Sequence, residues 1–101
     1  MKRKVSLLLI AILSSAGIAA AADAGALWNA NCAACHGKDG SGNTMMGKKL
    51  GVKDYTKDQG FSDADATNAI KNGKDKMKGF GSKLSDADIK ALVAYVRTLK
   101  K

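Results

Sequence analysis

The residues of this chain best suited to chemistry lie within five positions, Cys32-Ala33-Ala34-Cys35-His36. A C-x-x-C-H run is typical of c-type haem attachment, in which two thiols add to the vinyl groups of one haem and the imidazole ligates its iron. The chain has two cysteines and one histidine in all, and each of them lies in this run. The sequence therefore predicts one covalent haem c, attached by Cys32 and Cys35 and ligated by His36.

Cysteine pairs at this spacing have two other common uses in proteins. A C-x-x-C pair also serves thiol–disulfide exchange, but that chemistry is expected in a βαβ context, which the sequence does not indicate. A structural zinc site normally needs a fourth cysteine or histidine, and the chain offers three such residues, two of them adjacent. Haem attachment is the favoured interpretation.

The second axial position of the iron needs a ligand from elsewhere in the chain. Methionine suits it, because its thioether favours the ferrous state. Met77 lies in the polar, glycine-rich stretch 73–81, where a methionine is poor core filler. Met45 and Met46 follow His36 by only nine and ten residues and are predicted instead to pack near the haem. Met77 is therefore the predicted second ligand.

Two helices are predicted before the final one. The first runs from about Asp23, as N-cap or first-turn acid, through the haem motif, and Gly37 is expected to end it. The second runs over about Asp63–Asn72, with Ser62 as N-cap and an Asn-Gly pair as its stop signal.

The third predicted helix closes the chain and shows the clearest pattern. Ser85 is its expected N-cap, and Asp88 three residues later resembles a capping box. Its apolar residues recur at helical spacing, at Ile89, Leu92, Val93 and Val96. No strand pattern competes, so the predicted fold class is all-α: three main helices joined by glycine-rich loops that wrap around one haem.

The first 22 residues are predicted to be a secretory signal peptide. A basic start is followed by an apolar stretch and by small residues ending at Ala22, as in an A-x-A cleavage site. The alternative is an uncleaved membrane anchor. Cleavage would leave residues 23–101 as one domain in the periplasm, with no stable membrane insertion.

Charge and size limit the remaining function classes. Loss of residues 1–22 lowers the formal net charge from +8 to +5, and the remaining lysines lack an aromatic stacking platform, so nucleic-acid binding is not expected. So short a mature chain has a marginal hydrophobic core, and an attached porphyrin would supply apolar surface.

The assembled residues resemble a small bacterial class I cytochrome c, of the c6, c551 and c553 kind, over the whole of 23–101. Trp28 stands four residues before the first cysteine, where that family has an aromatic, and Leu92 and Tyr95 match its closing helix. The stretch from Gly73 to Gly81, with Met77 within it, matches the family's methionine loop. The resemblance implies a cytochrome c fold in which the closing helix packs on the opening one, with His36 and Met77 as axial ligands.

One residue departs from the family pattern. Lys78 replaces the proline that usually follows the methionine ligand, which would leave the loop less constrained and an amine near the iron. The predicted function is a soluble, monomeric periplasmic carrier of single electrons and not an enzyme. The alternative is a small-ligand sensor or weak peroxidase with a labile sixth ligand.

Lysines in the segments expected to border the haem suggest the nature of its partners. A basic rim would steer the protein toward redox proteins with acidic docking faces. The lysines concerned are Lys38, Lys48, Lys49, Lys53, Lys74, Lys76, Lys78 and Lys83.

Overall fold

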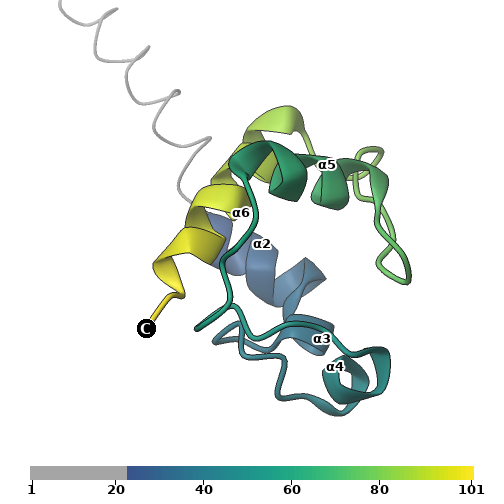
Figure 1. Cartoon of the computed structure of the whole chain (residues 1–101). Helices are drawn as coiled ribbons and strands as arrows, with labels where there is room; N and C mark the ends of the chain where they lie inside the picture. Colours follow the sequence, from purple (N-terminus) through teal and green to yellow (C-terminus); the bar gives the residue numbers. More distant parts are fainter. Residues whose placement is uncertain (1–22) are drawn as a thin grey trace, which may run out of the picture.

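The computed structural model describes residues 23–101, and the signal peptide predicted for residues 1–22 lies outside the described residues. The described chain is helical, as predicted, with one isolated bridge between Lys74 and Met77 and no strand. Its helices are α2 (Ala24–Asn31), α3 (Ala33–His36), α4 (Met45–Leu50), α5 (Asp63–Asn72) and α6 (Asp86–Thr98). Helices α2 and α3 meet at Cys32, and Figure 1 shows loops between the later helices.

Helix α6 is the centre of the packing, because both α2 and α5 lie against it. Its predicted apolar stripe is buried in full, at Ile89, Leu92, Val93 and Val96. From α2, Trp28 is buried and its ring centroid lies 5.8 Å from that of Tyr95. The opening and closing helices therefore pair as the family resemblance implies.

The first predicted helix is divided in two. Cys32, with φ −120° and ψ −32°, ends α2 and begins α3, and its carbonyl accepts hydrogen bonds from the backbone N–H groups of Cys35 and His36. Asp23 occupies the N-cap position of α2, but its side chain makes no capping hydrogen bond. Gly37, with φ 84°, ends α3 as predicted.

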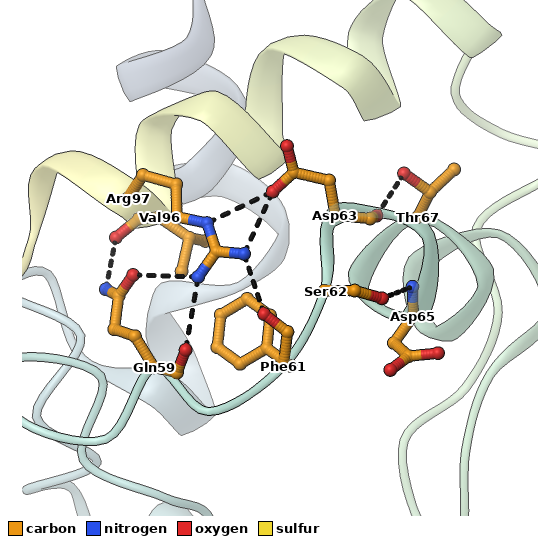
Figure 2. Close-up of polar contacts among 8 residues, drawn as sticks. All are labelled: Gln59, Phe61, Ser62, Asp63, Asp65, Thr67, Val96 and Arg97. Carbon is orange, nitrogen blue, oxygen red and sulfur yellow. Dashed lines mark hydrogen bonds and ion pairs between the residues drawn. The ribbon is translucent and has the colours of Figure 1, made fainter.

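The other predicted helix ends are confirmed. Helix α5 has the predicted bounds, and the Ser62 hydroxyl accepts a hydrogen bond from the Asp65 N–H (Figure 2). In α6 the Ser85 hydroxyl accepts from the Asp88 N–H and the Asp88 carboxylate accepts from the Ser85 N–H, which completes the capping box. These caps satisfy backbone donors that would otherwise lack partners at each helix start.

Helix α4 differs from the prediction, because the sequence predicts only a glycine-rich loop between Gly37 and Asp63. It is six residues long, it begins after the capping residue Thr44 and it ends at Gly51, which has φ 70°. Gly47 is its one buried residue, so α4 has no apolar stripe from which a sequence could reveal it.

Candidate haem-binding site

The motif residues are presented by the short helix α3. Cys32 is buried, Cys35 and His36 are half-buried, and both cysteines are free thiols. Burial raises the pKa of the Cys32 thiol to about 11, and the charge of Cys35 adds to the shift. Thiols used in disulfide exchange have lowered pKa values, so this environment does not favour that use of the pair.

The zinc alternative is also disfavoured by geometry. Within residues 23–101, no three side chains of His, Cys, Asp or Glu converge as metal ligands do.

The environment of His36 favours the neutral form of its imidazole. Burial lowers the pKa of His36, which favours the uncharged ring, the form that ligates iron. Its Nδ1 atom is buried and has no hydrogen-bond partner in the described part of the chain. Buried polar atoms usually have partners, so this ring fits a site completed by a bound group.

Thr44 fastens α4 to the motif. Its hydroxyl donates to the Cys35 carbonyl at 2.7 Å and accepts from the Gly47 N–H at 2.8 Å. Gly47 permits this contact, because a Cβ there would collide with the Cys35 carbonyl oxygen. The end of α3, whose carbonyls lack helical partners, is thus fixed by the N-cap of the next helix.

Met77 lies in the loop between α5 and α6, which is fastened to the end of α5. The Phe80 N–H donates to the Ile70 carbonyl at 2.8 Å and the Gly81 N–H to the Lys71 carbonyl at 2.9 Å. Lys74 and Met77 exchange two backbone hydrogen bonds of 2.9 Å, in a tight turn where Asp75 has φ 54°. Met77 is half-buried against the core, so the loop presents it from a fixed backbone.

Comparison with known proteins identifies the family. Residues 19–96 match the sequence profile of the family described as cytochrome C oxidase, cbb3-type, subunit III. Cytochrome c6 of Pyropia yezoensis is 38% identical over 104 residues, covering 95% of this chain and 93% of that protein. The chain belongs to the cytochrome c family. It is a small class I monohaem cytochrome c.

Other relatives agree with this assignment. Cytochrome c6 of a Synechococcus species is 42% identical over 76 residues, which cover 74% of this cytochrome and 66% of that protein, so the chain spans about two thirds of its length. A solved structure, the KustC0563 c-type cytochrome, is similar with a TM-score of 0.73 and 34% identity, covering 78% of this chain and 99% of that one.

Another relative is a larger protein, the cbb3-type cytochrome c oxidase subunit FixP of Azorhizobium caulinodans. It is 40% identical over 74 residues, which cover 72% of this cytochrome but 25% of FixP. Membership establishes the cofactor class, since cytochromes c bind haem c covalently and Cys32, Cys35 and His36 fit the C-x-x-C-H motif. This cytochrome is a haem electron carrier and not an enzyme.

The structure adds detail on the two methionines of α4 and on Lys78. Met45 and Met46 are 90% and 47% exposed on α4, and their packing near the haem stays a prediction. Lys78, which replaces the usual proline of the loop, holds its Nζ 5.5 Å from the centroid of the Phe80 ring.

Sequence reasoning missed several residues that support this cytochrome's motif. Thr44 could have been found as a threonine before a short helix, but no glutamate or glutamine three residues later marks a capping box. Tyr55, whose ring lies 5.4 Å from that of His36, carried no local signal at all.

Among the described residues, no helix combines the length and the apolar character needed to cross a bilayer.

Proposed function

We propose that this cytochrome carries one haem c on Cys32 and Cys35, with His36 and Met77 as the axial ligands of its iron, and shuttles single electrons between redox proteins in the periplasm. The observation that carries the proposal is the His36 imidazole, directly after Cys35 on α3: burial lowers its pKa, and its buried Nδ1 has no hydrogen-bond partner among residues 23–101. The haem, when bound, supplies the one-electron couple of its iron.

The cysteines of the motif would attach the haem, and His36 would ligate its iron. Cys32 and Cys35 would hold the haem through two thioether bonds, each formed when an S–H group adds across a vinyl double bond. The neutral imidazole of His36 needs no deprotonation to act as a ligand. With both axial positions filled from the chain, the iron would exchange electrons without binding a substrate.

Support for Met77 comes from its loop. The loop is tied to the last turn of α5 by two backbone hydrogen bonds, so the thioether is offered from a backbone whose path is already fixed. In Figure 1 this loop lies at the right of the molecule, and α3 and α4 lie below it. A preorganised ligand loses little conformational entropy when it binds.

Exposed lysines support the proposed class of partner. All eight lysines predicted to form the basic rim are exposed, and the rim gives the protein a positive field that favours encounter with acidic docking faces. We propose that the protein acts as a monomer after export and removal of residues 1–22.

The axial ligands can be tested by replacing Met77 with alanine. The ferric wild type should show the absorption band of methionine-ligated haem at neutral pH, and M77A should lose it, because alanine offers the iron no ligand. M46A is the matched control, since its side chain lies on the exposed face of α4 and should leave the band unchanged.

Two outcomes would contradict the proposed ligation. One is a band that survives in M77A and disappears in M46A. The other is evidence of an open iron position in the wild type. Such evidence would be a high-spin ferric spectrum, or a change in the absorption spectrum of the reduced protein when carbon monoxide is added, and it would favour small-ligand binding.

A further inference from the structure

The imidazole of His36 is packed against two aromatic rings from other parts of the chain. The ring of Tyr55 is stacked on it, with centroids 5.4 Å apart and an interplanar angle of 28°. The ring of Trp28 lies 5.6 Å away at 34°. Trp28 is held within α2 and donates a buried hydrogen bond to the Gly37 carbonyl, whereas Tyr55 lies in a loop and needs support from elsewhere.

Two contacts hold Tyr55 from its own loop. Its backbone carbonyl accepts a 2.8 Å hydrogen bond from the Gln59 side-chain amide, which also donates to the Val96 carbonyl of α6 at 2.9 Å. Its ring meets the Phe61 ring edge-on, with centroids 5.5 Å apart at 70°. Gln59 and Phe61 therefore fix the backbone and the ring of Tyr55 respectively.

A single side chain, Arg97 of α6, holds both of these supports (Figure 2). One terminal nitrogen of its guanidinium donates to the side-chain oxygen of Gln59 at 3.2 Å and to the Gln59 carbonyl at 3.3 Å. The other donates to the Phe61 carbonyl at 2.7 Å. The guanidinium carbon also lies 4.4 Å from the centroid of the Phe61 ring.

The shape of the guanidinium matters more here than its charge. Arg97 pairs with Asp63 at 2.9 Å, but their side chains are 35% and 74% exposed, and ion pairs that water screens stabilise little. The bonds to Gln59 and Phe61 need several donors in one plane together with a flat face for the ring, which an ammonium group cannot provide.

We propose that Arg97 is a positioning residue for the iron ligand: through Gln59 and Phe61 it holds Tyr55, and Tyr55 sets the orientation of the His36 imidazole. This inference rests on the proposed function, in which His36 ligates the haem iron. Groups around a metal ligand fix its ring plane and thereby tune the metal, so the arrangement controls the electronic state of the iron.

The test compares Arg97→Lys and Tyr55→Leu with the wild-type holoprotein. R97K keeps the charge but loses the planar set of donors, and Y55L removes the stacked ring. In both variants we expect the ferric electron paramagnetic resonance g values to shift, together with the paramagnetically shifted ring resonances of His36 and the reduction potential. R97K also keeps the test valid if Y55L folds poorly.

Two matched controls separate orientation from other effects. Tyr55→Phe keeps the stacked ring and should retain the wild-type g values. Asp63→Asn weakens the exposed ion pair while leaving the Gln59 and Phe61 carbonyls as acceptors, and should also retain them.

The inference is overturned if R97K and Y55L keep the wild-type g values, or if D63N shifts them as far as R97K does. Failure of the proposed function would be visible in the wild type alone, as a spectrum without histidine ligation. The two failures are therefore distinguishable before any variant is compared.

Discussion

At the scale of single residues, the departure at Lys78 decides how firmly the proposed Met77–iron bond is held. The Lys78 Nζ lies 5.5 Å from the centroid of the Phe80 ring, so the amine is held in the loop that carries Met77. Amines in general ligate iron only in their uncharged form, which alkaline pH favours.

We therefore expect Lys78 to make the methionine ligation of the ferric protein sensitive to alkaline pH. In absorption titrations, K78P should keep the methionine band to higher pH than the wild type, because it lacks the amine and has a restricted φ. K78Q, which removes only the amine, separates the two causes. Equal midpoints in all three proteins would show that this position does not control the ligation.

Thr44 is the residue whose hydroxyl joins the motif helix to α4. Replacing it with valine, which has nearly the same shape, removes both the N-cap bond to Gly47 and the bond to the Cys35 carbonyl. We expect a loss of about 1–2 kcal/mol in the free energy of unfolding, measured by denaturant titration of the holoprotein.

The matched control for T44V is Thr67→Val. The Thr67 hydroxyl also donates to a backbone carbonyl, that of Asp63, but it lies exposed within α5 and caps nothing (Figure 2). T67V should therefore lower the free energy of unfolding markedly less than T44V does. If T67V destabilises the protein as much as T44V, the link between α3 and α4 has no special energetic role.

At the scale of elements, the loop of Met77 depends on glycines that allow close backbone contact. A Cβ on Gly79 would lie 2.6 Å from the carbonyl carbon of Asn72 and 2.7 Å from the carbonyl oxygen of Lys71, and neither backbone atom can move without disturbing the end of α5. We expect Gly79→Ala to destabilise the protein by about 1–3 kcal/mol and to reduce the methionine band in the ferric spectrum.

Gly60→Ala is the control for this effect. A Cβ there would have only the Asp58 carboxylate as a neighbour, at an ordinary 3.6 Å, so alanine should be neutral or stabilising by up to about 1 kcal/mol. A G79A protein that melts like G60A would mean that the loop is not fixed by its contact with α5.

Elements with their own caps and apolar stripes could be predicted from the sequence. Ser62 and Ser85 predict the starts of α5 and α6, because a serine directly before a run of apolar residues at helical spacing is a local signal of a helix N-terminus. The division at Cys32 and the helix at Met45–Leu50 could not be predicted, because the first has no capping side chain and the second has no apolar stripe.

The same distinction applies to the site. Cys32, Cys35 and His36 form a contiguous motif, and the family pattern around Met77 extends over a few residues. Arg97, by contrast, is one cation in the last turn of α6, and only the fold brings it to Gln59 and Phe61, 38 and 36 residues earlier. Supporting residues of this kind leave no local pattern.

At the scale of the whole molecule, the protein interior is small for independent folding. The largest fully buried side chains are Ile89 and Leu92, and α6 also supplies Val93 and Val96 to the buried cluster. The loop between α5 and α6 adds only Phe80 and Leu84 to it. A domain of this size usually needs an additional source of stability.

The attached porphyrin is the expected source, since it adds a large apolar surface against which α3 and the Met77 loop could both pack. We predict that a protein unable to attach haem, C32A/C35A, is largely unfolded, with weak helical circular dichroism and no cooperative melting, whereas the holoprotein melts cooperatively. The reason is that α2, α5 and α6 alone must offset the ordering of the long loops, whose conformational entropy cost is high. A folded C32A/C35A protein with a cooperative transition would show that the contacts of α6 with α2 and α5 suffice without the haem, and that the cofactor serves electron transfer alone.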